Sequence, residues 1–167
     1  MWEDEDSGLK VQVWEKYDRR EMRFGNHIMQ SVFSRINANH LVLPYSRFMV
    51  LGLIFCPEPK SALHFGLGGG SIPRWLHIHF PELQQTVIEK NASVIEAAQR
   101  YFEFPIDKRI RIIHGNAEKI IENLESKFDL IFLDAFGEYG APEEVTNTFF
   151  LKELSRCLNP GGWLAGN

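Results

Sequence analysis

The residues with the clearest chemical potential are four glycines within six positions, Gly66-Leu67-Gly68-Gly69-Gly70-Ser71. Because glycine has no side chain, the backbone N–H groups of such a loop, and of a helix that follows it, can approach a ligand closely. The dinucleotide fingerprint G-x-G-x-x-G needs a glycine at Ser71 and is incomplete, whereas G-x-G-x-G is complete through Gly66, Gly68 and Gly70. The loop predicts a nucleotide-like ligand; a turn that only packs a helix on a strand is the alternative.

A second candidate is Glu89, which ends a predicted strand 23 positions after Gly66. A carboxylate about 20 residues beyond a glycine loop binds ribose hydroxyls in dinucleotide folds. No Gly-Lys-Ser or Gly-Lys-Thr follows the loop, so a P-loop is excluded. Together the two features predict a ligand that contains adenosine; a solvated glutamate at a strand end is the alternative for Glu89.

For these residues to act together, strands and helices must hold them at one edge of a sheet. Short apolar runs alternate with segments of helical spacing from residue 61 onward. We expect strands at 61–66, 85–89, 110–114, 128–133 and from 163, and helices at 72–80, 93–102 and 117–124. This alternation predicts an α/β fold, a mostly parallel sheet with helices on both faces. Ligands then lie beyond the carboxyl ends of the strands, at 66–71, 89, 115–117 and 134–139.

The first 43 residues follow a different pattern. Residues 1–9 are acidic and lack an apolar period, so we expect them to be frayed. Short alternations of polar and apolar residues then predict two or three antiparallel strands. An apolar segment from Pro44 to just before Pro57 predicts a core helix. We divide the chain into an N-terminal tail with a small β-hairpin region, 1–43, and an α/β domain, 44–167.

Five segments in this order resemble the spermidine synthase family, and most of all its bacterial spermidine synthase-like branch: 63–71 (LHFGLGGGS), 87–89 (VIE), 114–117 (HGNA), 128–136 (FDLIFLDAF) and 158–162 (LNPGG). The resemblance implies a Rossmann-like class I S-adenosylmethionine-dependent methyltransferase fold. It also implies a sulfonium co-substrate, S-adenosylmethionine or decarboxylated S-adenosylmethionine, and in true synthases aminopropyl transfer to putrescine. The fifth strand would be one of seven, so we expect the C-terminal strands to be truncated.

The resemblance assigns roles to binding residues. Gly66, Gly68 and Gly70 match the loop under the methionine-derived part of the co-substrate, and Glu89 matches the ribose carboxylate. Asn116 stands where the family usually has an aspartate near the adenine amino group. An amide oxygen can accept the same hydrogen bond, so adenine recognition can survive this change.

The catalytic segment departs from the family pattern. Asp134 matches the first aspartate of the D-S/A-x-D segment and is expected to face the ligand. The second aspartate, which should take a proton from the attacking amine, is replaced by Gly137, and the nearest carboxylate is Glu138. We assign catalysis to Asp134 and Glu138. The loop that contains Glu138 and Tyr139 is either a lid or a plain surface loop.

Two further departures concern the acceptor. The Tyr-His-Glu segment that helps to seat the diamine reads Tyr45-Ser46-Arg47 here, and the aspartate inside the glycine loop is Gly69. Burying a dication without carboxylates is costly, which argues against putrescine. If Arg47 faces the pocket, it favours an anionic acceptor or the carboxylate of intact S-adenosylmethionine; an exposed helix arginine is the alternative. The acceptor is a small molecule whose identity stays open, with an amine among the candidates.

Composition excludes several classes of partner. The 167 residues include 18 basic and 22 acidic side chains, a net charge of -4 that offers no positive field for nucleic acid. The longest apolar stretch, 48–56, is too short to span a membrane, and the acidic start does not resemble a signal peptide. Six histidines lack the spacing of metal ligands, and two cysteines suit a reducing compartment. We expect a cytoplasmic protein without a metal.

Three functions remain open. A transferase that moves a methyl or aminopropyl group leads; a non-catalytic relic that keeps the nucleoside pocket and acts through protein contacts is the alternative, supported by Gly137. A nicotinamide-dependent oxidoreductase is third, weakened by Ser71. The resemblance implies a homo-oligomer, and an open apolar edge at the fifth strand also predicts association.

Overall fold

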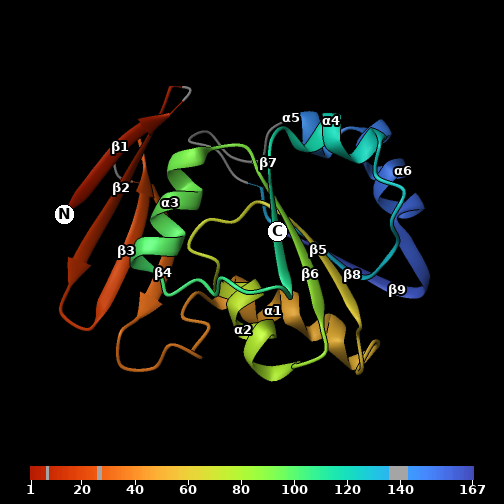
Figure 1. The fold of residues 1–167 in the computed structure, drawn as a ribbon, viewed down its shortest axis with the longest axis horizontal. Helices are drawn as coiled ribbons and strands as arrows, with labels where there is room; N and C mark the ends of the chain where they lie inside the picture. The colour runs from red at the N-terminus through yellow and green to blue at the C-terminus, as the bar shows by residue number, and fades with distance from the viewer. Residues whose placement is uncertain (7, 26–27, 136–142) are drawn as a thin grey trace.

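The structure, a computed structural model, describes residues 1–6, 8–25, 28–135 and 143–167. It contains two sheets (Figure 1): an antiparallel one in the order β1-β2-β3-β4 and a five-stranded one in the order β7-β6-β5-β8-β9. The strands are β1 (Trp2–Asp6), β2 (Leu9–Lys16), β3 (Arg19–Phe24), β4 (Ile28–Ser34), β5 (Ser61–Phe65), β6 (Gln84–Glu89), β7 (Ile110–His114), β8 (Phe128–Leu133) and β9 (Leu158–Gly166). The helices are α1 (Pro44–Met49), the 3₁₀ helix η1 (Val50–Ile54), α2 (Ser71–His79), α3 (Ala92–Tyr101), α4 (Ala117–Glu122), α5 (Glu143–Thr146) and α6 (Thr148–Arg156).

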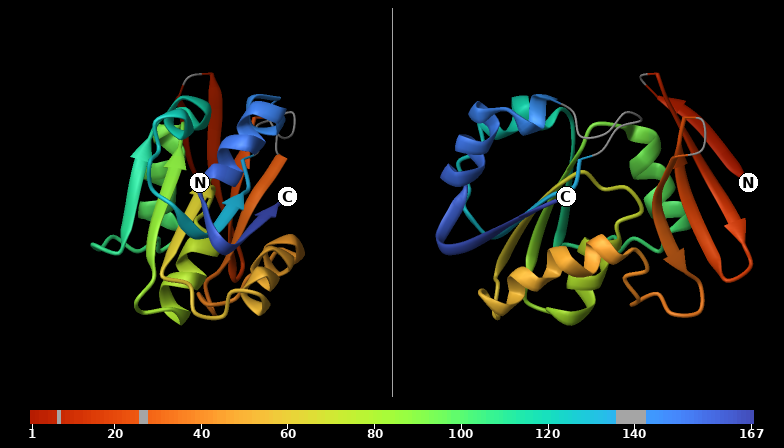
Figure 2. Two further views of the ribbon diagram at one scale, coloured as in Figure 1. Left: turned by 90° about the vertical axis from the view of Figure 1, so that its right-hand side faces the viewer. Right: turned by 180° about the vertical axis from the view of Figure 1, so that it is seen from behind.

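The five-stranded sheet is parallel throughout and has helices on both sides (Figure 2). Successive residues of β5 point to opposite faces, as in any strand. Leu63 and Phe65 pack in one buried cluster with residues of α5 and α6, whereas Ala62 packs in another with residues of α1 and α2. The chain runs outward from β5 to β7 and returns at β8, so the strand order reverses beside β5, where such sheets bind ligands. The predicted α/β fold, with a parallel sheet between helices, is confirmed.

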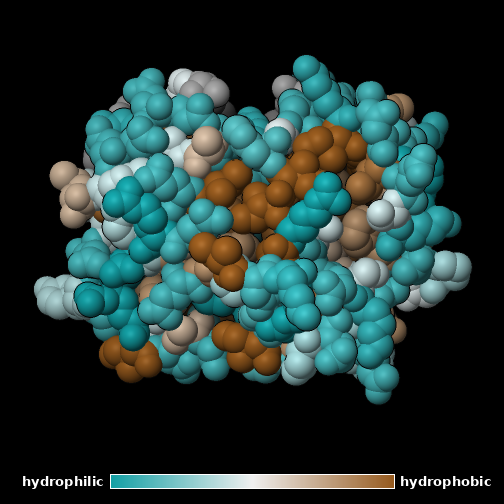
Figure 3. Space-filling model, in the orientation of Figure 1, coloured by the Kyte–Doolittle hydropathy of each residue, from teal (hydrophilic) through white to brown (hydrophobic). Residues whose placement is uncertain are grey.

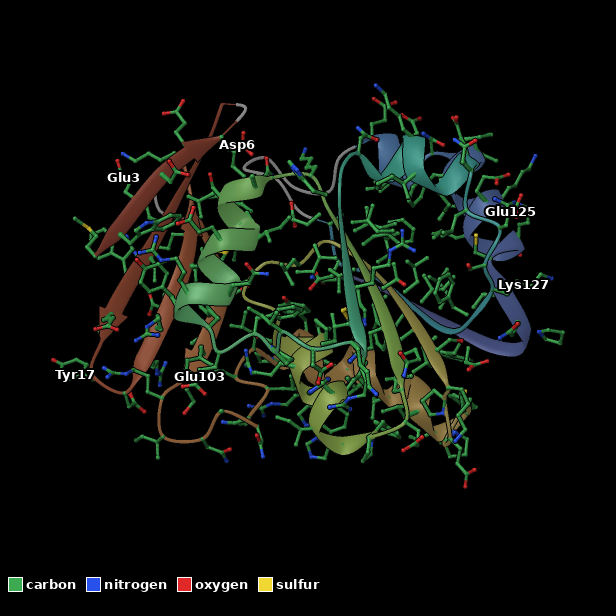
Figure 4. All side chains as sticks on the ribbon, viewed as in Figure 1. Glu3, Asp6, Tyr17, Glu103, Glu125 and Lys127 are labelled. Carbon is green, nitrogen blue, oxygen red and sulfur yellow. The ribbon has the colours of Figure 1, made fainter. Side chains whose placement is uncertain are left out.

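The N-terminal sheet has four strands, and the expectation of a frayed start is wrong. Trp2–Asp6 pairs with β2 along its whole length. Asp4 accepts a hydrogen bond from the Ser93 hydroxyl at 2.7 Å, and Asp6 accepts one from the backbone N–H of Ala92 at 2.7 Å. Figure 4 shows Asp6 over the first turn of α3. The acidic residues therefore hold the amino-terminal end of α3, where carboxylates are favourable, rather than solvating a loose tail.

The apolar segment after Pro44 is not a core helix. It forms six residues of α1 and then tightens into η1, with Met49 and Gly52 buried. Phe48, Leu51, Ile54 and Phe55 are 70%, 50%, 71% and 64% exposed, and we name these four the α1–η1 patch. The segment is apolar on nearly every side, so its pattern could not indicate which side faces the sheet.

Both outer strands of the parallel sheet carry apolar side chains that are partly exposed. On the face drawn in Figure 3, apolar side chains form a band across the middle, over the edge strand β7 and towards α4. At the other edge, the Trp163 ring of β9 stacks on Phe55 with centroids 4.4 Å apart, so β9 continues the α1–η1 patch. No helix in the described part of the chain is long and apolar enough to cross a membrane.

Candidate active site

The glycine loop joins β5 to α2 in a backbone conformation that requires glycine. Gly66, Gly68 and Gly70 have φ of +88°, +49° and +65°, a region that other residues rarely adopt. A Cβ on Gly66 would lie 2.3 Å from the carbonyl oxygen of Asp134, and one on Gly70 would lie 2.3 Å from the Phe104 ring. At Gly66 the loop therefore passes directly against the residue that follows β8, and at Gly70 it passes against the Phe104 ring.

Most of the loop's N–H groups already have protein acceptors. Gly66 donates to the carbonyl of Ile88 at 2.9 Å, and Gly70 donates to that of Leu67 at 2.8 Å. Leu67 donates to Glu89 at 2.9 Å, and Gly69 donates to the Ser31 hydroxyl at 2.8 Å. Few amides are left for a phosphate, so the loop supplies shape and close approach more than anion binding.

Glu89 lies at the end of β6 and is 7% exposed. One carboxylate oxygen accepts the N–H of Leu67, and the other accepts the backbone and side-chain N–H groups of Asn91 at 2.9 and 3.3 Å. Burial raises the pKa of Glu89, although these hydrogen bonds partly offset the rise. The side chain thus joins the glycine loop to β6 and still offers lone pairs to the cavity.

Asp134 follows β8 and is half-buried on the other side of the loop. The Tyr45 hydroxyl and the Asn167 side-chain amide both hydrogen-bond it, the latter at 3.2 Å. Burial raises the pKa of Asp134, and the two hydrogen bonds oppose this rise. Burial, with the charge of Asp134 next, likewise raises the pKa of Tyr45, which stays a hydrogen-bond donor.

A cavity of about 410 Å³ connects these groups. The predicted residues Gly66, Gly68, Glu89, Asn116 and Asp134 all line it, whereas Gly70 is not among the lining residues. Further lining residues come from the N-terminal sheet and from the sheet face under α1 and α2: Phe24, Met29, Gln30, Ser31, Leu43, Tyr45, His64, Ser71, Ile72, Pro73 and Phe132. A volume of this size suits a ligand of nucleoside dimensions.

Asn116 is the N-cap of α4. Its side-chain oxygen accepts the N–H groups of Glu118 and Lys119 at 2.9 and 3.3 Å. Both lone pairs of that oxygen are therefore occupied, and the side-chain amide is the polar group that remains for the cavity. This geometry does not support the expectation that the Asn116 oxygen accepts a hydrogen bond from the adenine amino group.

A buried arginine supports the loop from behind. Arg74 in α2 is 3% exposed and donates to the carbonyls of Phe102, Ala38 and Gly69 at 2.8, 3.2 and 3.3 Å. Its guanidinium also lies 4.7 Å above the Phe33 ring of β4. Burial lowers the pKa of Arg74 to about 10, so it stays charged near neutral pH. The amphipathic sequence pattern around Arg74 does not predict that this side chain supports the glycine loop.

His64 and Arg47 have structural partners. His64 is 2% exposed, stacks on Phe132 and lies with Nε2 2.9 Å from the Gln85 side-chain oxygen. Burial lowers its pKa to about 4, so its ring is neutral. Arg47 is exposed and donates to the carbonyl of Leu41 at 2.7 Å, away from the cavity. The alternative of an exposed helix arginine is therefore correct.

Gly137, Glu138 and Tyr139 fall outside the described residues. Among the described residues, no group of three or more His, Cys, Asp or Glu side chains is placed to hold a metal ion.

Comparisons with known proteins agree with this geometry. The model of the family described as a methyltransferase domain matches residues 62–162. A polyamine aminopropyltransferase of Vibrio vulnificus is 33% identical over 165 residues, which cover 94% of this chain and 55% of that protein. A probable spermidine synthase of Corynebacterium glutamicum superposes with a TM-score of 0.87 at 19% identity, over 99% of this chain and 62% of that one.

A human methyltransferase-like protein 13, solved with S-adenosylhomocysteine (SAH), superposes with a TM-score of 0.68 at 24% identity, over 73% of this chain and 63% of that one. The chain thus spans between half and two thirds of the length of these relatives. It belongs to the methyltransferase-domain family, with the class I fold of the spermidine synthases.

Proposed function

We propose that the protein is a transferase that binds S-adenosylmethionine or its decarboxylated form and transfers a methyl or aminopropyl group to an amine. One observation carries the proposal. A single cavity joins the glycine loop, a buried carboxylate that can hold a ribose, Glu89, and a second carboxylate beside the loop, Asp134. The Vibrio relative, a polyamine aminopropyltransferase, supports an amine as acceptor. The SAH complex of the human relative supports a ligand of this type.

The loop favours a sulfonium nucleoside over a dinucleotide. A pyrophosphate needs several free N–H donors at the start of the helix. Here four of the five N–H groups from Gly66 to Gly70 donate to the protein, and Pro73 in the first turn of α2 has none. These features favour the transferase over the oxidoreductase hypothesis.

The charges around the loop suit a cationic ligand. Glu89 and Asp134 lie on the two sides of the glycine loop, and both line the cavity. A sulfonium between two carboxylates in a half-buried site is attracted to both, since charge interactions weaken less there than in water. The cation Lys90 also lines the cavity but is exposed beyond Glu89.

In this proposal, Asp134 accepts the proton that the acceptor amine loses. A bound sulfonium supplies an electrophilic carbon. The neutral amine nitrogen forms the new N–C bond, the C–S bond breaks, and its electron pair stays on sulfur as a thioether. The proton that the nitrogen loses passes to the Asp134 carboxylate or through it to water. A raised pKa makes Asp134 a stronger base, and Tyr45 holds its orientation.

Calorimetric titration tests the proposal. We expect 5′-methylthioadenosine and at least one of S-adenosylmethionine and decarboxylated S-adenosylmethionine to bind. Glu89→Gln should weaken all of them about tenfold, because an amide accepts less strongly than a carboxylate. NADH serves as the comparison ligand. Absence of binding by all three nucleosides would refute the proposal, and binding without turnover of any amine would favour the non-catalytic relic.

A further inference from the structure

We propose that the acceptor is an amine with a single positive charge on an apolar stem, rather than a diamine. This inference depends on the transferase proposal above and narrows its substrate class. It comes from the distribution of charge and apolar surface over the two halves of the cavity.

The cavity has a nucleoside half and an acceptor half. Glu89, Asn91 and Asn116 follow β6 and β7 and line one end. With a ribose at Glu89, the base extends towards β7, and the reactive carbon lies by the glycine loop, on the side of β8. The acceptor therefore enters from the side formed by β4, the segment before α1 and the sheet face under α2, where Asp134 and Tyr45 lie.

This acceptor half is mostly apolar. Phe24, Met29, Leu43, Ile72 and Phe132 line it; Met29 is 47% exposed, whereas Phe24, Ile72 and Phe132 are at most 4% exposed. Gln30 and Ser31 add neutral polar groups, and the Ser31 hydroxyl already accepts the N–H of Gly69. An alkyl or aromatic stem can bury its surface against these side chains.

Among the side chains of the described residues, Asp134 is the one carboxylate in this half. The other carboxylate in the cavity, Glu89, is bound to the loop and to Asn91 at the far end. Tyr45 and His64 are uncharged near neutral pH, because burial raises the pKa of the first and lowers that of the second to about 4. Asp134 can thus pair one ammonium, whereas a second ammonium on the same stem would meet apolar side chains and lose its hydration.

A matched pair of amines tests the inference. n-Butylamine and putrescine share a four-carbon stem and differ by one ammonium. With methylthioadenosine at saturation, we expect calorimetry to show n-butylamine binding at least about tenfold more tightly than putrescine. Asp134→Asn should abolish the binding of both amines and leave methylthioadenosine binding within about twofold.

A variant of the apolar wall gives the converse result. Met29→Glu adds a carboxylate at a half-exposed position and should reverse the preference in favour of putrescine, whereas Met29→Gln, which adds no charge, should not.

The outcomes separate the two proposals. If methylthioadenosine fails to bind, the transferase proposal fails, and this one with it. If methylthioadenosine binds but putrescine binds as tightly as n-butylamine, or neither amine binds, or amine binding survives Asp134→Asn, this inference alone is overturned.

Discussion

At the scale of residues, the site combines groups whose environments oppose their charge. Asp134 is half-buried, and burial raises its pKa above the ordinary value of 3.8. A native pKa above the unfolded value means that the folded state binds more protons, so stability falls as pH rises through the folded pKa. The carboxylate therefore opposes folding near neutral pH, as expected of a functional group rather than a structural one.

Asp134→Asn should stabilise the protein and remove the proposed transferase activity. The amide keeps an acceptor for Tyr45 and removes the buried charge, so the melting temperature near neutral pH should rise by about 2–4 °C. The gain should shrink towards zero as pH falls below 3.8, where the wild-type side chain is also neutral. Amine transfer should fall by about 10²–10⁴-fold. Scanning calorimetry over pH measures the first effect, and an unchanged or lower melting temperature at neutral pH would contradict it.

His64 should produce the opposite dependence on pH. Burial lowers its pKa from 6.5 to about 4, so it favours folding above pH 6.5 and loses that contribution as pH falls towards 4. The loss is on the order of 3 kcal/mol. We therefore expect the free energy of unfolding, measured with denaturant, to fall more steeply between pH 6.5 and 4 in the wild type than in His64→Gln, whose side chain is neutral at every pH. Parallel curves would show that His64 is not held neutral by the fold.

The sequence predicts site residues best where a strand ends. Gly66, Gly68, Glu89 and Asp134 share one cavity because parallel strands end at the same edge. The sequence pattern could not show that the Asn116 oxygen accepts the N–H groups at the start of α4, since this depends on the local turn. Nor could it find Ser31, which reaches the loop across 38 positions of chain. Contacts between distant segments leave no periodic signal.

At the scale of elements, the N-terminal sheet is part of the site rather than an appendage. Ser31 and Arg74 connect β4, the glycine loop and the end of α3. The parallel sheet follows from alternating apolar runs and was predictable. The prediction of a core helix at the α1–η1 segment is wrong because apolar content alone does not distinguish a core helix from an exposed face. A segment that is apolar on nearly every side cannot bury all of its side chains against a single sheet.

Arg74→Leu should destabilise the whole chain. The change leaves the carbonyls of Phe102, Ala38 and Gly69 without this donor in a buried place, each at a cost of about 1 kcal/mol or more, so we expect a loss of about 3 kcal/mol in unfolding free energy. Arg100→Leu, on the exposed side of α3, is the matched control and should change little. Urea unfolding measures both. Equal effects would mean that Arg74 does not hold the loop.

At the scale of the whole molecule, the exposed apolar surface is continuous with an open strand. β9 is one edge of the parallel sheet, and no strand among the described residues pairs with its outer side. It carries no charged residue between Leu158 and Gly166, and charge is the usual protection of an edge strand. Trp163, 38% exposed, joins this edge to the α1–η1 patch.

We therefore expect the chain to associate through β9 and the α1–η1 patch. Edge pairing satisfies free backbone groups and removes apolar side chains from water together, so a second copy of the same edge suits it. Light scattering after size exclusion should show a mass above 19.3 kDa at micromolar concentration. Phe55→Asp should shift the equilibrium towards the monomer, because a charge in the patch would have to be buried. Ile36→Asp, at a residue 80% exposed outside the patch, should not. A wild-type chain that stays strictly monomeric, or equal effects of the two variants, would contradict this use of the surface.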